Sequence, residues 1–359
     1  MRWDSLKIDA EAAVGETQPL PGYRDAAVVR RFDAPDALDT RFYEVRAKSA
    51  LNRVPAASRM PFRWTVNPYR GCTHACTYCF ARPTHTYLGW DAGRDFEREI
   101  VVKVNAPEVL AAELQKPSWA REHVALGTNT DPYQWVESKY RLMPGIWAAL
   151  RDARTPASVL TKSPLLLRDL EVMRELASVA PFSANLSIPT LDRAAWRATE
   201  PHTPSPRARL EAVAELNRNG IPTGILIAPL MPGINDDPRQ VDALLTAAAE
   251  AGATGIGGTA LHLRGDVRGV FMDWLRSQRP DLVALYEELY AGGAYAPPAE
   301  RKRLSELLRR SGAPRAAPFT RDPSCGPASR SEAQRGVVGG AGAAGTGRPC
   351  TPAVQKALF

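Results

Sequence analysis

Three cysteines in one short stretch of the sequence are the residues best suited to carry chemistry. Cys72, Cys76 and Cys79 form a C-x3-C-x2-C pattern. Thiolates on one short loop can face a common point, and soft sulfur ligands suit iron–sulfur clusters or zinc. A structural zinc ion usually takes four protein ligands, so zinc would require His74 or His85 as well. A cubane iron–sulfur cluster held by three cysteines instead leaves one iron open to another ligand.

The other cysteines do not suggest a disulfide framework. The chain has five cysteines, and Cys325 and Cys350 lie far from the other three in a C-terminal segment of biased composition. An odd, clustered set in a reducing compartment indicates a metal or redox site rather than disulfides. Unliganded structural cysteines are the remaining interpretation. The pattern therefore favours a metal centre.

The sequence shows no sign of a membrane segment or a secretion signal. No apolar run approaches the roughly 18 residues that a membrane-spanning helix needs. The segment Met1–Lys7 lacks the apolar core and the small-residue cleavage site of a signal peptide. We therefore expect a cytoplasmic protein that does not enter a membrane.

The positive charge of the chain is a weak argument for nucleic-acid binding. The net charge is +7 over 359 residues. From residue 313 onward there are six basic and two acidic residues, a net +4, which leaves +3 for residues 1–312. The main part of the chain is therefore nearly balanced, and its charge does not select nucleic acid over other substrates.

Short apolar runs alternate with helical stretches from residue 61 onward. Such alternation predicts a parallel sheet covered by helices, and this number of units suits a closed or partly open barrel. Active sites in such barrels form at the carboxyl ends of the strands. The expected strands are 62–66, 100–104, 123–127, 157–161, 182–188, 224–228 and 254–259, and the expected helices are 107–115, 144–153, 165–179, 205–219, 237–251 and 267–278.

These patterns divide the chain into four parts. Residues 1–60 show little sustained periodicity and are expected to form an irregular N-terminal extension. Residues 61–312 are expected to form the barrel domain with C-terminal helices. Residues 313–354 are rich in Ala, Gly, Pro, Ser and Arg, and we expect a disordered linker because such a segment buries too little apolar surface. Residues 355–359 are expected to act as a separate short peptide.

The cysteine pattern, with Tyr78 directly before the third cysteine, resembles the signature of the radical S-adenosylmethionine (SAM) superfamily. The resemblance implies a partial (β/α)6 barrel of the TIM type, a 4Fe–4S cluster on the three cysteines, and SAM bound to the open iron. It also implies one-electron cleavage of SAM to a 5′-deoxyadenosyl radical that abstracts a substrate hydrogen. A reductase such as flavodoxin or ferredoxin would supply the electron.

Further segments resemble the branch of this superfamily that contains spore photoproduct lyase and the DNA repair photolyase-like proteins. They are Ala125–Gln134, Leu160–Pro164, Glu200–Pro206 and Ile227–Asp236. The resemblance covers about residues 61–275. It implies a substrate that is nucleic acid or derived from a nucleotide, in a repair or modification reaction.

The same resemblance assigns SAM contacts to five residues. Tyr78 would line the cluster and the adenine, and Thr130 would place a hydroxyl near SAM. Lys162 would pair with the methionine carboxylate, Ser187 would supply a hydroxyl on the ribose side, and the backbone of Ala228 would touch the adenine. A carboxylate requires a cation, and polar groups at strand ends can converge on one ligand. The alternatives are a surface position for Lys162 and turn-stabilising roles for both hydroxyls.

Several other polar residues lie near expected strand ends. Asp131 suits the cap of a turn. Glu200 and His202 flank the proline-rich segment before an expected helix and could face the site. His262, Arg264 and Asp266 follow the last expected strand, where they could reach a substrate or belong to a solvated loop.

One departure from the lyase pattern limits the functional prediction. The lyase has a cysteine that donates a hydrogen atom to the product radical in the segment matching Leu126–Asp131, and this chain has none there. A threonine hydroxyl is a much poorer hydrogen-atom donor than a thiol. The sequence therefore predicts SAM cleavage but leaves three hypotheses: a nucleic-acid substrate, a peptide or small-molecule substrate, and a metal-stabilised binding module without turnover.

The last five residues, Gln355–Phe359, resemble the peptide by which bacterial replication and repair proteins bind the β sliding clamp. A flexible tether that carries a short apolar anchor is typical of such peptides. Lys356 and Ala357 depart from the usual Gln-Leu-x-Leu-Phe pattern. The sequence therefore suggests the clamp as a partner, with a chance apolar terminus as the alternative.

Overall fold

A computed structural model of the chain describes residues 12–32, 34, 39–55, 58 and 60–310. The expected linker 313–354 and the expected clamp-binding peptide 355–359 lie outside the described residues. Cys325 and Cys350 lie outside them as well. None of the helices in the described ranges is long and apolar enough to cross a membrane.

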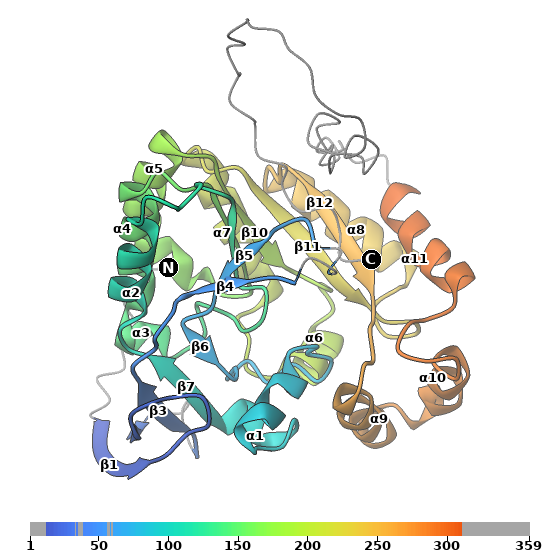
Figure 1. The fold of residues 1–359 in the computed structure, drawn as a ribbon. Coiled ribbons are helices and arrows are strands. Elements are labelled where there is room, and N and C mark those ends of the chain that lie inside the picture. The colour runs from blue at the N-terminus through green and yellow to red at the C-terminus, as the bar shows by residue number, and fades with distance from the viewer. Residues whose placement is uncertain (1–11, 33, 35–38, 56–57, 59, 311–359) are drawn as a thin grey trace, which may run out of the picture.

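Six parallel strands form the main sheet, with one antiparallel strand at its edge (Figure 1). Antiparallel β4 (Leu51–Arg53) pairs with β5 (Trp64–Val66), which pairs with β8 (Val124–Leu126). The sheet then continues through β9 (Ala157–Thr161), β10 (Phe182–Ser187), β11 (Thr223–Leu230) and β12 (Ile256–Ala260). The predicted partial (β/α)6 barrel is confirmed.

The strands consist largely of buried residues because helices cover the sheet. All six residues of β10 are buried, as are four of the five in β9. Figure 1 shows α2 (Ala106–Leu114), α4 (Leu142–Asp152) and α5 (Leu170–Val179) on one side of the sheet. The shorter helical elements are η3 (Arg82–Leu88), α1 (Arg94–Arg98), α3 (Glu137–Tyr140), η4 (Pro164–Asp169), α6 (Arg193–Thr199), η5 (Pro280–Leu282) and α10 (Val283–Leu289).

Two of the longer helices begin at side-chain caps that the sequence provides. Ser205 caps α7 (Pro206–Arg218), and Asp237 caps α8 (Pro238–Glu250). Each cap is followed by a proline at the first helical position, where its missing N–H costs nothing. Helix α7 packs on β10 and β11. The Ser205 cap therefore fixes where α7 begins, next to the strands on which it packs.

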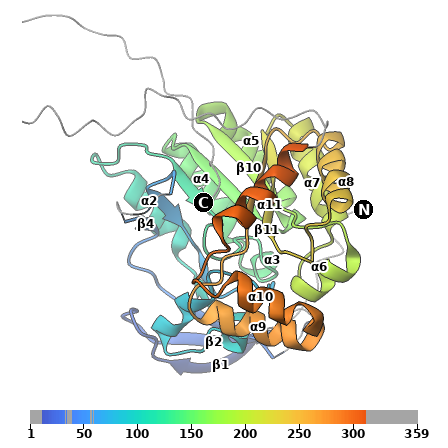
Figure 2. The ribbon, with the colours of Figure 1, turned by 90° about the vertical axis from the view of Figure 1, so that its right-hand side faces the viewer.

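Helix α11 (Pro298–Arg310) packs on the edge strand β12. Figure 2 shows α9 (Asp266–Gln278) and α10 below α11. The strand carries a glycine where the helix approaches it. A Cβ on Gly258 would lie 2.3 Å from Leu308 Cδ1. The C-terminal helices thus complete the domain at the open side of the barrel.

A second, smaller sheet corrects two expectations. It contains β1 (Ala12–Gln18), β2 (Ala27–Phe32), β3 (Arg41–Val45), β7 (Glu99–Lys103) and β6 (Tyr69–Arg70). The expectation that residues 1–60 are irregular was wrong for the described strands, and the expected strand 100–104 does not belong to the barrel. β3 lies parallel to β7, and Glu99 at the start of β7 accepts hydrogen bonds from Arg41 and Tyr43. These contacts between residues far apart in the sequence favour the pairing of β7 with β3 rather than with a strand of the barrel.

Candidate active site

The three cysteines lie on one loop between β6 and η3. Cys72 and Cys76 are buried and Cys79 is partly exposed, and all three are free thiols. Cys79 packs against two apolar clusters, one of which contains Cys72 and the other Cys76. The loop therefore gathers the three thiols around one region of the protein.

The thiols have the properties expected of ligands that still carry their protons. Burial, followed by Asp131, raises the pKa of Cys72. Burial raises the pKa of Cys76 to about 12, although nearby Lys162 acts in the opposite direction. Iron stabilises cysteine in its thiolate form, so binding of a cluster to these buried thiols would release protons. The donor set fits a 4Fe–4S cluster.

A single metal ion fits this loop less well. The described residues contain no group of three or more His, Cys, Asp or Glu side chains that could hold one ion. A cubane places each cysteine on a different iron, so its ligands are further apart than those of one ion. His74 pairs with Asp131, and His85 Nε2 contacts the Glu99 carbonyl at 2.8 Å. The described residues therefore show no set of ligands arranged for a zinc ion.

Gly71 allows the loop to turn directly before Cys72. Its φ is +78°, a conformation that favours glycine. A Cβ at this position would lie 2.9 Å from the Phe96 carbonyl oxygen. That oxygen accepts a hydrogen bond from the Cys72 N–H at 2.9 Å. Because Gly71 has no side chain, the backbone at Gly71 and Cys72 can lie directly against the carbonyl of Phe96 in α1.

Arg82 holds the far end of the cysteine loop from within the protein. Its side chain is 1% exposed and donates hydrogen bonds to the carbonyls of Cys76 (2.9 Å), Ala92 (3.1 Å) and Gly93 (2.8 Å). Its charge is paired with Glu97. Arg82 therefore has a structural role at this end of the loop.

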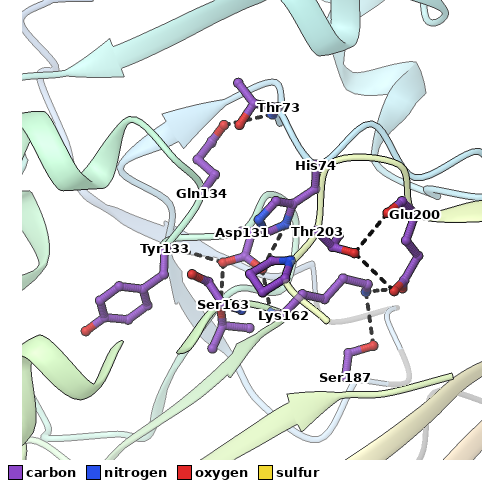
Figure 3. Close-up of polar contacts among 12 residues, drawn as sticks. Thr73, His74, Asp131, Tyr133, Gln134, Lys162, Ser163, Ser187, Glu200 and Thr203 are labelled. Atoms are coloured by element: carbon purple, nitrogen blue, oxygen red, sulfur yellow. Dashed lines mark hydrogen bonds and ion pairs between the residues drawn. The ribbon is translucent and has the colours of Figure 1, made fainter. Parts of the chain in front are cut away.

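Gln134 clamps the near end of the same loop, and sequence reasoning missed it. Its Oε1 accepts a hydrogen bond from the Thr73 N–H at 3.0 Å, as Figure 3 shows, and its Nε2 donates one to the Gly71 carbonyl at 3.1 Å. The residue is completely buried. Its presence in the segment that follows β8 was the one available signal.

Replacing Gln134 with alanine is expected to loosen the loop. The change leaves two buried backbone groups unpaired, at about 1–3 kcal/mol of unfolding free energy each. We expect a lower midpoint of thermal unfolding and less iron bound after anaerobic reconstitution. Gln240→Ala, on the exposed surface of α8, is the matched control. Full iron content and unchanged stability in Gln134→Ala would contradict this role.

Asp131 joins the cysteine loop to the end of β9 (Figure 3). Its carboxylate lies 3.4 Å from His74 Nδ1 and accepts hydrogen bonds from Thr161 Oγ1 (2.6 Å) and the Lys162 N–H (2.7 Å). It also caps a turn by accepting the Tyr133 N–H at 2.9 Å. Burial alone would raise the pKa of Asp131, but His74, Thr161 and the Lys162 backbone lower it to about 2. The carboxylate is therefore ionised at neutral pH.

Lys162 and Ser187 meet because their strands are adjacent. Thr161 of β9 is in register with Leu186 of β10, so the residues that follow leave the sheet side by side. Lys162 Nζ donates to Ser187 Oγ at 3.0 Å and lies 5.8 Å from the centre of the Tyr78 ring. The Lys162 side chain is only 16% exposed. A solvent-facing lysine is therefore excluded, and three of the predicted contact residues converge.

Glu200 completes this group, as its position beside the proline-rich segment suggested. Its Oε1 lies 3.7 Å from Lys162 Nζ (Figure 3) and accepts a hydrogen bond from the Tyr78 hydroxyl. Arg209 Nη2 binds Glu200 Oε2 at 2.7 Å. Burial would raise the pKa of Glu200, but Arg209 and Lys162 lower it overall. Burial would lower the pKa of Lys162, but Cys76 and Glu200 raise it overall.

The other two predicted contact residues occupy different positions. Thr130 is buried, and its hydroxyl donates to the Tyr69 carbonyl at 3.0 Å, so it supports the backbone before the cysteine loop. The carbonyl of Ala228 accepts a hydrogen bond from Ser187 Oγ at 3.4 Å. Ala228 thus joins the Lys162 group, whereas the contacts of Thr130 match the turn-stabilising alternative.

The remaining polar candidates make no hydrogen bond or ion pair with this group in the described residues. His202 is exposed, as are Arg264 and Asp266. His262 stacks on Tyr295 with ring centres 4.3 Å apart. A cavity of about 560 Å³ between the ends of α2 and α4, lined by Trp119 among others, contains none of the predicted site residues. The chemistry of the described residues is concentrated around the cysteine loop and Lys162.

The chain is similar to known proteins in both sequence and family pattern. Residues 66–245 match the model of the Radical SAM superfamily. An uncharacterised protein of Mycobacterium tuberculosis is 47% identical over 308 residues, which cover 86% of this chain and 91% of that protein. An uncharacterised protein of Methanocaldococcus jannaschii is 28% identical over 198 residues, which cover 54% of this chain and 69% of that protein.

Solved structures of spore photoproduct lyase share the fold. The lyase complexed with dinucleoside spore photoproduct gives a TM-score of 0.56 at 17% identity and covers 75% of this chain and 78% of the lyase chain. A lyase variant with bound AdoMet and dinucleoside spore photoproduct gives a TM-score of 0.55 at 17% identity, with coverages of 74% and 77%. At this level of identity the likeness establishes the fold.

Proposed function

This chain belongs to the radical SAM superfamily, and we propose that it binds a 4Fe–4S cluster through Cys72, Cys76 and Cys79 and cleaves SAM. When bound, the cluster and SAM supply a 5′-deoxyadenosyl radical that abstracts a hydrogen atom from the substrate. The family uses both cofactors, and the three free thiols fit the cluster.

The convergence of Lys162, Ser187 and Tyr78 beside Cys76 is the observation that carries this proposal. A buried cation next to the cluster ligands suits the carboxylate of SAM, because a charge-assisted hydrogen bond is strong where water is excluded. Ser187 and the backbone of Ala228 would hold the ribose and adenine side. The sequence resemblance and the position of these groups support the same arrangement.

An apolar lining supports the exclusion of water from this region. Cys76 and Tyr78 pack in one cluster with Met231, Leu261 and Leu263, which follow β11 and β12. Exclusion of water strengthens charge-assisted contacts such as the one proposed between Lys162 and the SAM carboxylate, because the local dielectric is low. The residues after the last two strands would therefore help to keep the SAM site dry.

We propose nucleic acid, or a nucleotide-derived molecule, as the substrate. The fold shared with a lyase that was solved with a dinucleoside photoproduct supports this choice. The reaction would differ from that of the lyase, because the segment Leu126–Asp131 contains no cysteine and the free cysteines of the described residues are those of the cysteine loop. A peptide or small-molecule substrate remains the alternative.

Transfer of deuterium into 5′-deoxyadenosine tests the substrate class. Reconstituted protein with a chemical reductant would be incubated with SAM and with deuterated oligonucleotides, nucleosides or peptides. We expect mass-shifted 5′-deoxyadenosine with an oligonucleotide or nucleoside. A mass shift found with peptides alone would overturn the nucleic-acid proposal and leave SAM cleavage intact. Flavodoxin and ferredoxin are the proposed physiological reductants, tested by replacing the chemical reductant with each.

The sliding clamp is a second proposed partner, and it rests on the sequence of residues 355–359 alone. A synthetic peptide of the last dozen residues should bind the clamp with micromolar affinity, as expected of a short motif that orders on binding. Replacing Leu358 and Phe359 with alanine should remove that binding. If the peptide did not bind the clamp at millimolar concentration, the clamp would be ruled out as a partner.

A further inference from the structure

Glu200 and Arg209 are buried residues that were not among the predicted SAM contacts, and they connect three residues that were: Tyr78, Lys162 and Ser187. Glu200 binds Tyr78 and Lys162, and Arg209 binds Glu200 and donates to the Ser187 carbonyl at 2.8 Å. We propose that Glu200 and Arg209 are positioning residues that orient the Lys162 ammonium for the carboxylate of SAM. This inference rests on the proposed function and names the residues that prepare its cofactor site.

The charges of this group favour an incoming anion. Lys162 and Arg209 are cations and Glu200 is an anion, and all three side chains are at least mostly buried. Arg209 lies closer to Glu200 than Lys162 does, at 2.7 Å against 3.7 Å, and the other nearby anion, Asp131, binds the Lys162 backbone N–H. The Lys162 ammonium is therefore the cation of this group that has no close carboxylate partner. It can accept the carboxylate of SAM in a region from which water is largely excluded.

Glu200 keeps its hydrogen bonds when Lys162 turns to a ligand. Its Oε1 accepts from Tyr78, and its Oε2 accepts from Arg209 at 2.7 Å and lies 3.4 Å from Thr203 Oγ1. The 3.7 Å approach of Lys162 is the longest of these contacts. Lys162 has three N–H donors, of which Ser187 takes one. Lys162 can therefore bind a carboxylate without leaving Glu200 unpaired.

The proline-rich segment fixes Arg209 in the first turn of α7. Ser205 caps the helix, Pro206 begins it, and Arg209 Nε donates to the Pro204 carbonyl at 2.9 Å. Its guanidinium is fully buried and reaches three elements at once. A planar fork with several donors suits this task better than an ammonium. Segment 201–206 therefore affects the site indirectly, because it holds Arg209 in position.

A double-mutant cycle on SAM binding tests the proposal. Glu200→Gln removes the charge and keeps the size of the side chain, and Lys162→Met removes the ammonium. SAM dissociation constants would be measured by anaerobic equilibrium dialysis on iron-replete proteins. If Glu200 acts through Lys162, Glu200→Gln weakens SAM binding about 10-fold alone but less than about 2-fold in the Lys162→Met background. Glu211→Gln, on the exposed face of α7, is the matched control.

Each other result would overturn the inference. An equal loss of affinity in both backgrounds would mean that Glu200 does not act through Lys162, and unchanged affinity would mean that it does not act on SAM. Loss of iron or of folding in Glu200→Gln would assign Glu200 to the cysteine loop, through Tyr78, instead. If the unmodified, iron-replete protein bound no SAM, the proposed function itself would fail, which is distinguishable from these outcomes.

Discussion

Replacing Cys72, Cys76 or Cys79 with alanine is expected to abolish both the brown iron–sulfur chromophore and the cleavage of SAM. A cubane with one open iron needs all three thiolates, and the described residues contain no fourth cysteine that could take the place of a lost one. We therefore expect complete loss in each single variant rather than a graded decrease.

Iron and sulfide content, the visible absorption spectrum and 5′-deoxyadenosine formation after anaerobic reconstitution measure this outcome. Cys325→Ala and Cys350→Ala are the matched controls, because they lie far along the chain from the cysteine loop and outside the C-x3-C-x2-C pattern. Both should retain a full cluster. A normal chromophore in any of the three loop variants, or loss of iron in either control, would contradict the ligand assignment.

Replacing Lys162 with alanine is expected to weaken SAM binding while sparing the cluster. The ammonium is held at Ser187 and Glu200, and Lys162 follows β9 rather than lying on the cysteine loop, so its loss removes a partner of the carboxylate and no iron ligand. Losing one partner of a charge-assisted pair typically costs about 1.5–3 kcal/mol, or roughly 10- to 150-fold in affinity.

Anaerobic SAM binding to iron-replete Lys162→Ala measures this loss, with Lys302→Ala as the control. Lys302 lies on the exposed side of α11, and its removal should change nothing. Unchanged SAM affinity in Lys162→Ala would remove the carboxylate role from this residue. A deficit of iron in the same variant would indicate that Lys162 stabilises the cysteine loop, contrary to our assignment.

The barrel was largely predictable because its elements carry strong local signals. The strand expected at 157–161 has those bounds in the structure, and the helix expected at 267–278 is α9, which begins one residue earlier. Strand 100–104 was assigned to the wrong sheet because a short apolar run looks the same in either one. Its partner β3 is selected by contacts of Glu99 with Arg41 and Tyr43, which are distant in sequence.

The site was predictable where a motif marked it and not elsewhere. The cysteines, Lys162 and Ser187 follow recognisable segments, and parallel strands bring their ends together. Arg209 gave no such signal and Gln134 only its place at the end of a resembling segment, because a single glutamine or arginine looks like a surface residue until its burial is known. Their roles depend on contacts with backbone carbonyls and amides of other loops, and a sequence pattern does not reveal such contacts.

The formation of 5′-deoxyadenosine from SAM tests the central claim most directly. Protein reconstituted with iron and sulfide would be reduced, incubated anaerobically with SAM, and analysed by chromatography with mass detection. We expect 5′-deoxyadenosine and methionine in the presence of the cluster and neither with Cys76→Ala. If cluster-replete, reduced protein that binds SAM produced no 5′-deoxyadenosine, even with oligonucleotide, nucleoside and peptide substrates present, the chain would not be a radical SAM catalyst.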